Sequence, residues 1–287
     1  MNACIFILTH NRAERQYTAN LLKELGTKIP YYLVVDDQDP ELDLYKKNYD
    51  NLLIFNKEDA IKELNVDLCD NFKNYLCTVI SRNICFKFAK DLGYDYFVEL
   101  DDDYHCISYR HEKNKKLLQP TIKDSFDEIM EAYITFLENS GIDGVAFAQM
   151  GDYIGGVQSK MHRRKYIQKI MNWIFLKTDS DVRFRGTMND DVSTFTLLGS
   201  QGYIFITPTY ISVKPDITQA TSGGLTDLYL NQGTYVKSFY SVMNMPSAVK
   251  ISVMGSTTKQ RHGNYRIHHR VFWGNCYPKI IDEKYKK

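Results

Sequence analysis

The 287-residue sequence contains no closely spaced pair of cysteines. Its six cysteines are scattered and form no CxxC motif, at Cys4, Cys69, Cys77, Cys85, Cys106 and Cys276. Structural zinc sites and the disulfide frameworks of small secreted domains both need closer, regular spacing. The pattern therefore argues against both kinds of site and predicts reduced thiols, as in a cytoplasmic protein.

Long hydrophobic runs are also missing. No stretch approaches the roughly 20 apolar residues that a membrane-spanning helix needs. The short apolar run in MNACIFILTHNR has no basic leader before it. Internal repeats, low-complexity tracts and an obvious linker are absent as well. We therefore expect a soluble cytoplasmic protein with no membrane partner, folded as a single domain over residues 1–287.

A net charge of +1 hides an asymmetry between the two halves of the chain. Residues 1–150 carry 17 Lys and Arg against 26 Asp and Glu, whereas residues 151–287 carry 19 against 9. A local excess of one sign attracts ligands of the other sign. We expect the acidic half to meet one anionic ligand through a bridging cation and the basic half to meet another directly.

Short apolar runs alternate with helix-like segments in the first half. The runs are ACIFIL (3–8), YYLVV (31–35), LLIF (52–55), YFVEL (96–100) and GVAFAQ (144–149), and the helix-like segments lie near 12–25, 72–92 and 122–139. Later runs, MNWIFLK and GYIFITP, are less regular. The alternation predicts an α/β fold with a mixed, mostly parallel central sheet flanked by helices.

Polar residues follow three of these runs, as Thr9-His10-Asn11-Arg12, Asp36-Asp37 and Asp101-Asp102-Asp103. Ligands of open α/β sheets bind beyond the carboxyl ends of the strands, so we expect the three clusters to converge. Adjacent carboxylates repel one another unless a cation lies among them. Asp101 and Asp103, two residues apart, can face one cation, and oxygen ligands suit Mg²⁺ or Mn²⁺. The alternative is a solvated acidic turn.

The segment ISRNICFKFAKDLGYDYFVELDDD (80–103) resembles GT-A fold glycosyltransferases, in which an Arg-Asn pair opens a helix and the next strand ends in a DxD motif. The first strand with THNR resembles the start of the same fold. The resemblance implies a Rossmann-like GT-A fold and a nucleotide-sugar donor, UDP-sugar, whose diphosphate shares Mn²⁺ or Mg²⁺ with Asp101 and Asp103. It also implies a donor-contacting set, with Asp102 toward the sugar or structural, Arg82 and Asn83 near the nucleotide, and Thr9, Asn11, Arg12 and Asp37 around base and ribose.

The segment GTMNDDVSTFTLLGSQGYIFIT (186–207) is similar to the acceptor-side acidic motif of the same family. There, one carboxylate takes the proton from the attacking hydroxyl group. We expect Asp191 to be this base, with Asp190 as the reserve. Asn189 and Asp190 are also good N-capping residues for a helix that starts near Val192, and capping does not exclude catalysis.

The segment KQRHGNYRIHHRVFWGN (259–275) contains two adjacent histidines. GT-A enzymes often complete the coordination of the cation with a C-terminal His, and His268 is the expected ligand, with His269 left open. If the segment is a strand, adjacent side chains point to opposite faces and only one can reach the site.

The basic stretch KMHRRKYIQK (160–169) is the expected acceptor surface. Its residues Arg163, Arg164, Lys165 and Tyr166 suit a phosphate backbone and an unstacked base. The alternative is a solvated helix face, which charge runs usually form.

Over most of its length the chain resembles the TET/JBP-associated glycosyltransferases, phage and protist enzymes. The resemblance implies transfer of a sugar to a hydroxymethylated pyrimidine in DNA, in the host cytoplasm if a phage encodes the protein. Residues 1–150 then bind the nucleotide sugar and residues 151–287 the acceptor. One base and one cation favour inversion, and retention stays open. Alternatives are a glycan or protein acceptor and a non-enzymatic DNA-binding protein.

Two other enzyme classes fit the sequence less well. Phosphatases of the haloacid dehalogenase type carry DxD on the first strand and continue to Thr or Val, whereas here Tyr104 and His105 follow the motif. Sugar nucleotidyltransferases carry a Gly-rich loop near the N-terminus, and THNRAER has no Gly.

Overall fold

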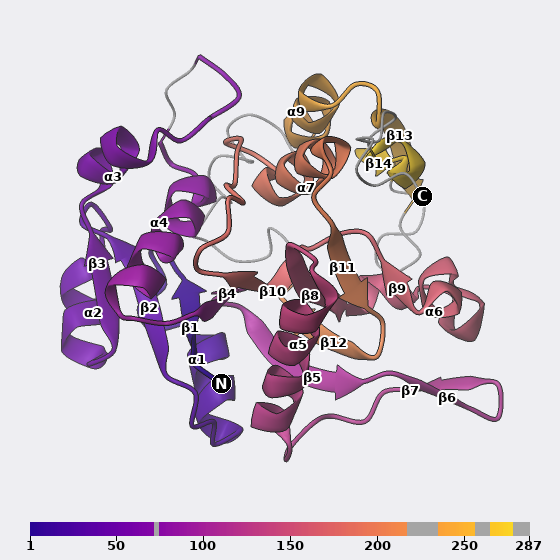
Figure 1. Cartoon of the computed structure of the whole chain (residues 1–287), viewed down its shortest axis with the longest axis horizontal. Coiled ribbons are helices and arrows are strands. Elements are labelled where there is room, and N and C mark those ends of the chain that lie inside the picture. The colour runs from indigo at the N-terminus through magenta and orange to yellow at the C-terminus, as the bar shows by residue number, and fades with distance from the viewer. Residues whose placement is uncertain (72–74, 217–234, 256–264, 278–287) are drawn as a thin grey trace.

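The computed structural model of the chain describes residues 1–71, 75–216, 235–255 and 265–277 (Figure 1). A sheet of ten strands lies at its centre, and helices cover both faces of this sheet. Two further pairs of strands form separate antiparallel hairpins. No helix within these ranges is both long enough and apolar enough to cross a membrane.

The strands of the central sheet are β1 (Ala3–Leu8), β2 (Tyr31–Asp36), β3 (Leu52–Phe55), β4 (Tyr96–Asp101), β5 (Tyr104–Tyr109), β8 (Gly144–Gln149), β9 (Tyr166–Ile167), β10 (Asn172–Lys177), β11 (Phe205–Pro208) and β12 (Ile211–Pro215). The hairpins are β6 (His111–Lys113) with β7 (Lys116–Leu118), and β13 (Val249–Gly255) with β14 (Tyr265–Val271). The α-helices are α1 (Tyr17–Glu24), α2 (Leu42–Asn48), α3 (Lys57–Leu64), α4 (Thr78–Asp91), α5 (Phe126–Ser140), α6 (Lys160–Arg164), α7 (Asp190–Gln201) and α9 (Val236–Asn244).

The sheet has the order β3-β2-β1-β4-β10-β8-β11-β9, with β12 pairing β8 and β5 off this path. β1 pairs in parallel with β2 and β4, and β3 pairs in parallel with β2. β10 runs antiparallel to both of its neighbours, β4 and β8. The carboxyl ends of β1, β2, β4 and β8 therefore meet the start of β10 at one edge. The expected α/β fold, a single domain with a mixed, mostly parallel central sheet flanked by helices, is confirmed.

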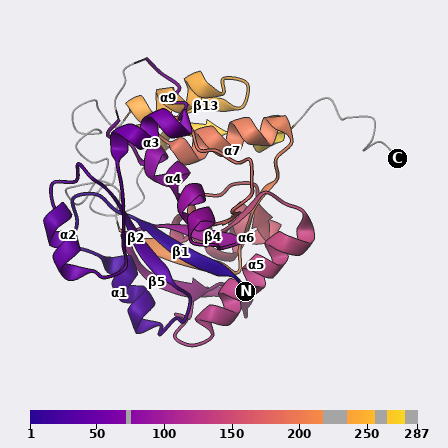
Figure 2. The same cartoon turned by 60° about the vertical axis from the view of Figure 1, so that its left-hand side comes forward.

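The central strands are buried on both faces because their side chains alternate between two apolar clusters. In β1, Ile5 and Ile7 join one cluster, whereas Phe6 and Leu8 join the other. The first cluster takes residues from α1 and α5, and the second takes residues from α3, α4 and α7. Figure 2 shows these two groups of helices on opposite sides of the sheet. Burial from two sides explains why these strands read as continuous apolar runs.

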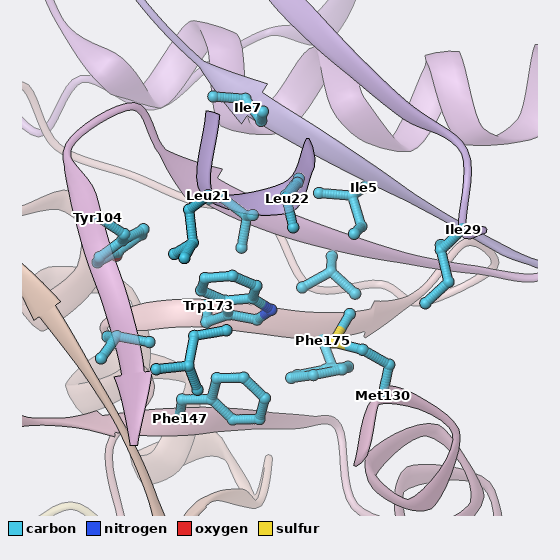
Figure 3. Close-up of a cluster of buried hydrophobic side chains, with 14 of the residues drawn as sticks. Ile5, Ile7, Leu21, Leu22, Ile29, Tyr104, Met130, Phe147, Trp173 and Phe175 are labelled. Atoms are coloured by element: carbon cyan, nitrogen blue, oxygen red, sulfur yellow. The ribbon is translucent and has the colours of Figure 1, made fainter. Parts of the chain in front are cut away.

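Trp173 lies in the middle of the first cluster (Figure 3). Its ring stacks on Phe147 with the centroids 5.3 Å apart and lies 5.6 Å from the ring of Tyr104. The residue has a positive φ of 54° and coincides with a register shift between β10 and β8. A bulge of this kind re-aims the neighbouring side chains. The core thus anchors Trp173, while Asn172 before it lines a cleft at the carboxyl edge of the sheet.

The structure differs from the prediction at the basic stretch 160–169 and at strands β5 and β12. The basic stretch 160–169 is helical only in part, because α6 ends at Arg164, Lys165 adopts a positive φ of 66°, and β9 follows. β5 and β12 have no counterpart among the predicted strands. They pair with each other, Ile211 opposite Tyr109, and the sequence YHCISY of β5 contains no continuous apolar run that would mark a strand.

Helix α7 supports the segment that follows β14. Trp273 stacks on Phe195 with the ring centroids 5.3 Å apart. One turn further along α7, a Cβ atom on Gly199 would lie only 2.8 Å from the carbonyl oxygen of Cys276. The glycine therefore permits the close approach of this segment to the helix.

We predict that Gly199→Ala displaces this segment and lowers the free energy of unfolding by about 1–3 kcal/mol, the usual cost of overpacking. Urea denaturation gives the stability. Tryptophan emission of the folded protein reports the segment, because Trp273 lies in it and stacks on Phe195, whereas Trp173 is fully buried in the first cluster. Gly274→Ala is the control, since a Cβ there meets nothing within 4 Å. Unchanged stability and emission in Gly199→Ala would contradict the prediction.

Candidate active site

A cleft of about 350 Å³ opens at the carboxyl edge of the sheet. The loops after β1, β2 and β4, the starts of α4 and α7, and the first residue of β10 contribute to its walls. Its charged lining comes from segments far apart in the sequence, namely His10, Arg12, Asp36, Lys57, Arg82, Asp101, Asp102, Asp103, Asp190, Asp191, Asp216 and Lys237. The expected convergence of the three polar clusters is confirmed, and the acid pair of α7 joins them.

The three adjacent aspartates have different surroundings. The side chain of Asp101 is 40% exposed, and its Oδ1 lies 3.4 Å from Nη2 of Arg82. Asp103 has a buried Oδ1 atom with no hydrogen-bond partner. Burial, followed by the charges of Asp101 and Asp102, raises the pKa of Asp103 to about 7. Asp103 is therefore the carboxylate with most to gain from a cation.

Asp102 is structural, one of the two roles expected for it. Its side chain is buried, and both carboxylate oxygens are occupied. Oδ2 accepts a 2.6 Å hydrogen bond from the hydroxyl of Thr9, and Oδ1 accepts a 2.7 Å bond from Nη1 of Arg12. The Thr9 hydroxyl also lies 2.8 Å from the hydroxyl of Tyr45 on α2. These contacts hold the loop after β1 to the loop after β4.

Arg82 lies between the triple-aspartate turn and the acid pair. Its side chain is 7% exposed, and Nε donates a 2.6 Å bond to Asp190. Nη1 lies 3.2 Å from Glu99 and Nη2 lies 3.4 Å from Asp101. Burial would lower the pKa of Arg82, but the charges of Asp190, Asp101 and Glu99 outweigh it and raise that pKa. The guanidinium thus links carboxylates of α7 and β4.

The acid pair at the start of α7 divides into a paired and a less restrained carboxylate. Asp190 is buried and paired with Arg82. Asp191 is half-buried, and its Oδ1 accepts a 2.7 Å bond from the backbone N–H of Val192. Burial, followed by the charge of Asp190, raises the pKa of Asp191 to about 7. A carboxylate with this pKa can accept a proton at neutral pH.

Asn189, an expected N-capping residue, occupies the N-cap position but does not cap the helix with its side chain. Asn189 is the N-cap residue of α7, with a positive φ of 48°, but its side chain makes no capping hydrogen bond. Its amide instead donates to the carbonyl of Lys237, at 3.0 Å, and to the hydroxyl of Ser241, at 2.9 Å. Asn189 therefore fastens α9 to the start of α7.

The family model described as TET-Associated Glycosyltransferase matches residues 3–224. The chain belongs to the TET-associated glycosyltransferases. Membership makes it an enzyme that transfers a sugar and implies a nucleotide-sugar donor. No curated protein matches the chain.

The TET-associated glycosyltransferase has distant likenesses among solved structures. A197 from STIV is 13% identical, with a TM-score of 0.36 over 76% of this chain and 86% of that chain. A mycobacterial protein is 8% identical, with a TM-score of 0.43 over 94% and 84%. Mannose-1-phosphate geranyltransferase from Thermus thermophilus is 13% identical, with a TM-score of 0.29 over 85% and 63%. We draw no functional conclusion from likenesses this low.

Five charged residues of the cleft are not among the site residues predicted from the sequence, namely His10, Asp36, Lys57, Asp216 and Lys237. His10 Nδ1 lies 3.4 Å from Asp36 and 3.2 Å from Asp39, and hydrogen bonds with these two carboxylates raise the pKa of His10 to about 9. Lys57 at the start of α3 lies 3.5 Å from Asp36. His10 is part of the THNR motif and Asp36 precedes the expected Asp37, so both were within reach of sequence reasoning. Lys57 follows a strand that ends at the same edge, but a lone Lys gives no signal.

Three of the predicted donor residues lie outside the lining of the cleft. The side-chain amide of Asn83 bonds to backbone atoms of Phe184 and Val79. Asp37 accepts bonds from Asn56 and from the backbone N–H of Lys57. Asn11 has a positive φ of 56° and donates its backbone N–H to Asp39. Each of the three has a structural partner in this part of the fold.

The two adjacent histidines lie on strand β14, but their rings are not on opposite faces of it, as adjacent residues of a strand would be expected to be. The ring centroids of His268 and His269 are 4.4 Å apart. Neither ring lines the cleft. His269 Nδ1 lies 3.4 Å from the amide nitrogen of Asn189, and burial, with the charges of His268 and Lys237, lowers the pKa of His269 to about 4. His269 is therefore a neutral neighbour of the acid pair.

The expected acceptor residues Arg163, Arg164, Lys165 and Tyr166 are all exposed. None of them lines the cleft. Lys169, from the same basic stretch, is buried and forms a 2.6 Å ion pair with Asp152. The exposed part of the stretch is therefore a surface separate from the cleft.

A divalent cation fits the residues of the triple-aspartate turn. Within the described ranges no three His, Cys, Asp or Glu side chains come together as a metal site. Asp101 and Asp103 nevertheless offer an exposed carboxylate and a buried oxygen that lacks a partner. Mg²⁺ commonly binds one or two carboxylates and takes its other ligands from phosphate oxygens and water. The residues present fit a cation that is shared with a diphosphate.

We predict that Arg82→Ala lowers the free energy of unfolding by about 3–5 kcal/mol at pH 8, because it leaves buried carboxylates without their cation. The loss should shrink toward pH 5, where those carboxylates take up protons instead. Urea denaturation at the two pH values measures it. Arg183→Ala, which removes an exposed arginine, should cost much less. Equal losses in the two variants would contradict the linking role of Arg82.

We also predict that Asp103→Asn stabilises the protein increasingly between pH 4 and pH 7. The unfolded carboxyl ionises near pH 3.9, whereas in the folded chain the pKa is about 7. The wild type therefore loses stability as the pH rises across this window, and Asn does not. Melting temperatures across the window test this, with the exposed Asp179→Asn as control.

The same variant tests the cation. Mn²⁺ that binds the folded wild type raises its melting temperature by mass action. Asp103→Asn should remove most of this increase. An equal increase in both proteins would mean that the cation binds elsewhere.

Proposed function

We propose that the protein transfers a sugar from UDP-sugar to the hydroxymethyl oxygen of a modified pyrimidine in DNA. The observation that carries this proposal is the cleft lined jointly by the triple-aspartate turn, the acid pair of α7 and the arginine that bridges them. A glycosyl transfer needs a site for a departing diphosphate and a base for an attacking hydroxyl. The triple-aspartate turn would supply the diphosphate site through its cation, and the acid pair of α7 would supply the base.

On the donor side, Asp101 and Asp103 would hold Mn²⁺ or Mg²⁺. When bound, the cation supplies a Lewis acid for the diphosphate. Thr9 and Arg12 position Asp102 and so hold the turn itself. We assign the nucleoside end of the donor to His10, Asp36 and Lys57, which line the cleft beside them. A protonated His10 and Lys57 add positive charge there.

On the acceptor side, Asp191 takes the proton from the hydroxymethyl group. The freed oxygen attacks the anomeric carbon, and the bond from that carbon to the diphosphate oxygen breaks with its electron pair on the diphosphate. Asp190 stays paired with Arg82 and orients the start of α7. A single displacement of this kind inverts the anomeric carbon. A retained configuration in the product would rule out this step while leaving the donor site intact.

The choice of DNA as the acceptor rests on charge and family. The second half of the chain carries 19 Lys and Arg against 9 Asp and Glu, and Arg163, Arg164, Lys165 and Tyr166 are exposed. Membership of the TET-associated family supports the same choice. The hydroxymethyl oxygen of a stacked base lies in the major groove, so the base must leave the stack to bring this oxygen to Asp191 inside the cleft.

The deciding experiment incubates the protein and Mn²⁺ with a panel of nucleotide sugars, with and without hydroxymethylated DNA. We expect release of nucleoside diphosphate with a UDP-sugar only when the modified DNA is present. Asp191→Asn should lower turnover by about 100- to 10,000-fold, the range for loss of a general base. Release with a glycan or protein but not with DNA would replace the acceptor. DNA binding without release from any donor would favour a non-enzymatic role.

The pH profile separates the two acids of the pair. Turnover should rise with pH through about 7, because Asp191 must lose its proton and burial with the charge of Asp190 raises its pKa to about 7. Asp190→Asn removes that charge, so this limb should move to lower pH. A limb that stays in place in Asp190→Asn would mean that another group is the base.

A further inference from the structure

A second hollow, of about 800 Å³, lies outside the cleft, between β9 and the segment that follows β14. Two arginines and four aromatic residues line it, namely Arg164, Tyr166, Arg270, Phe272, Trp273 and Tyr277. Tyr166 is 57% exposed, Phe272 41% and Tyr277 39%. Aromatic rings are rarely left open to water in such a group unless they meet a ligand.

The charge of the hollow is positive. Among the described residues that line it there is no Asp or Glu, and Arg163 and Lys165 are exposed on either side of Arg164. The guanidinium of Arg270 lies 5.1 Å from the centre of the Phe272 ring. Arginine over an open aromatic ring can meet a phosphate and a base at the same time.

Another hollow on the molecule provides a comparison. It has about 940 Å³ and also contains an arginine over a phenylalanine, Arg183 lying 4.5 Å from the centre of the Phe86 ring. Its lining, however, contains the four acids Glu63, Asp95, Asp179 and Asp181 beside its four basic residues. A polyanion therefore gains no net attraction there, whereas the hollow at Arg270 attracts it.

The β13–β14 hairpin places a second basic residue near Arg270. Its register sets Lys250 directly opposite Arg270, and the Lys250 ammonium donates a 3.0 Å bond to the carbonyl of Pro246. Like charges directly opposite each other destabilise an antiparallel pair. An anion bound at Arg270 would relieve this repulsion.

The hollow is close to the acid pair along α7. Trp273 stacks on Phe195, which follows Asp191 by four residues, or about 6 Å of helix. β14 also touches the start of α7, through His269 and Asn189. A DNA strand whose target base lies at Asp191 could therefore place a neighbouring nucleotide in the hollow.

We propose that this hollow is a binding site for single-stranded nucleic acid, with bases stacked on Tyr166, Phe272 and Trp273 and phosphates paired with Arg164 and Arg270. Stacking on aromatic rings within a basic groove is how unpaired strands bind without sequence preference. The choice of a nucleic acid over another polyanion rests on the proposed function. The site itself is separate from the cleft and needs no donor.

The test measures binding of a fluorescent oligothymidylate of about 12 nucleotides to the full chain without nucleotide sugar. Phe272→Ala and Tyr166→Ala should each weaken binding about tenfold, the effect of losing one stacked base. Arg270→Gln should weaken binding and lower the slope of log K against log salt by about 0.7. The matched control, Arg183→Gln, removes the arginine that covers Phe86 and should change neither quantity.

Tryptophan emission gives a second readout. Trp173 is fully buried, so quenching by unlabelled oligothymidylate would report on Trp273 in the hollow. Polyglutamate at equal charge should bind weakly and leave the emission unchanged. Equal binding of polyglutamate, equal losses in Arg270→Gln and Arg183→Gln, or unchanged affinity in both aromatic variants would overturn the proposal. The two aromatic residues lie on different segments, and circular dichroism shows that each variant is folded.

The outcome is separable from that of the proposed function. Oligothymidylate binding that depends on Phe272 and Arg270, without any sugar transfer to modified DNA, would keep this site and remove the acceptor. Sugar transfer to modified DNA, with unchanged oligothymidylate binding in these variants, would keep the proposed function and remove this site.

Discussion

The pairing of Arg82 with carboxylates from two parts of the chain is the constraint on which the site depends. Its guanidinium contacts Asp190, Glu99 and Asp101 within 3.4 Å while it is almost wholly buried. One positive charge cannot neutralise all three of these acids. Burial, followed by the charges of neighbouring aspartates, raises the pKa values of Asp103 and Asp191 to about 7.

The same arrangement separates the tasks of neighbouring carboxylates. Asp102 and Asp190 each have a short contact with an arginine and fix the geometry, while Asp103 and Asp191 beside them keep an oxygen or a charge that the fold does not satisfy. Unsatisfied groups of this kind lower stability and are found where function requires them. In this glycosyltransferase they meet at the edge of the sheet where α/β folds bind their ligands.

Sequence reasoning was most successful where the signal is local. The runs ACIFIL and GVAFAQ coincide with β1 and β8, because burial on both faces makes a strand continuously apolar. LLIF coincides with β3, an edge strand that is less buried. It was least successful for β5 and β12, whose sequences YHCISY and ISVKP contain no continuous apolar run, and for the stretch 160–169, where a positive φ at Lys165 ends the helix.

By itself, the sequence determined the α/β architecture and the edge at which the polar residues after β1, β2 and β4 gather, because periodicity and strand ends are properties of short segments. Only the tertiary structure brought Asp191, at the start of α7, to the same edge. Only the tertiary structure decided which carboxylate is paired and which is not. Arg82 and Asp190 are far apart in the sequence, and neighbouring aspartates have the same side chain. Their protonation depends on burial and on neighbours that packing alone brings together. The same holds for His10 beside Asp36 and for the aromatic hollow at Arg270, whose parts come from β9 and from the segment after β14.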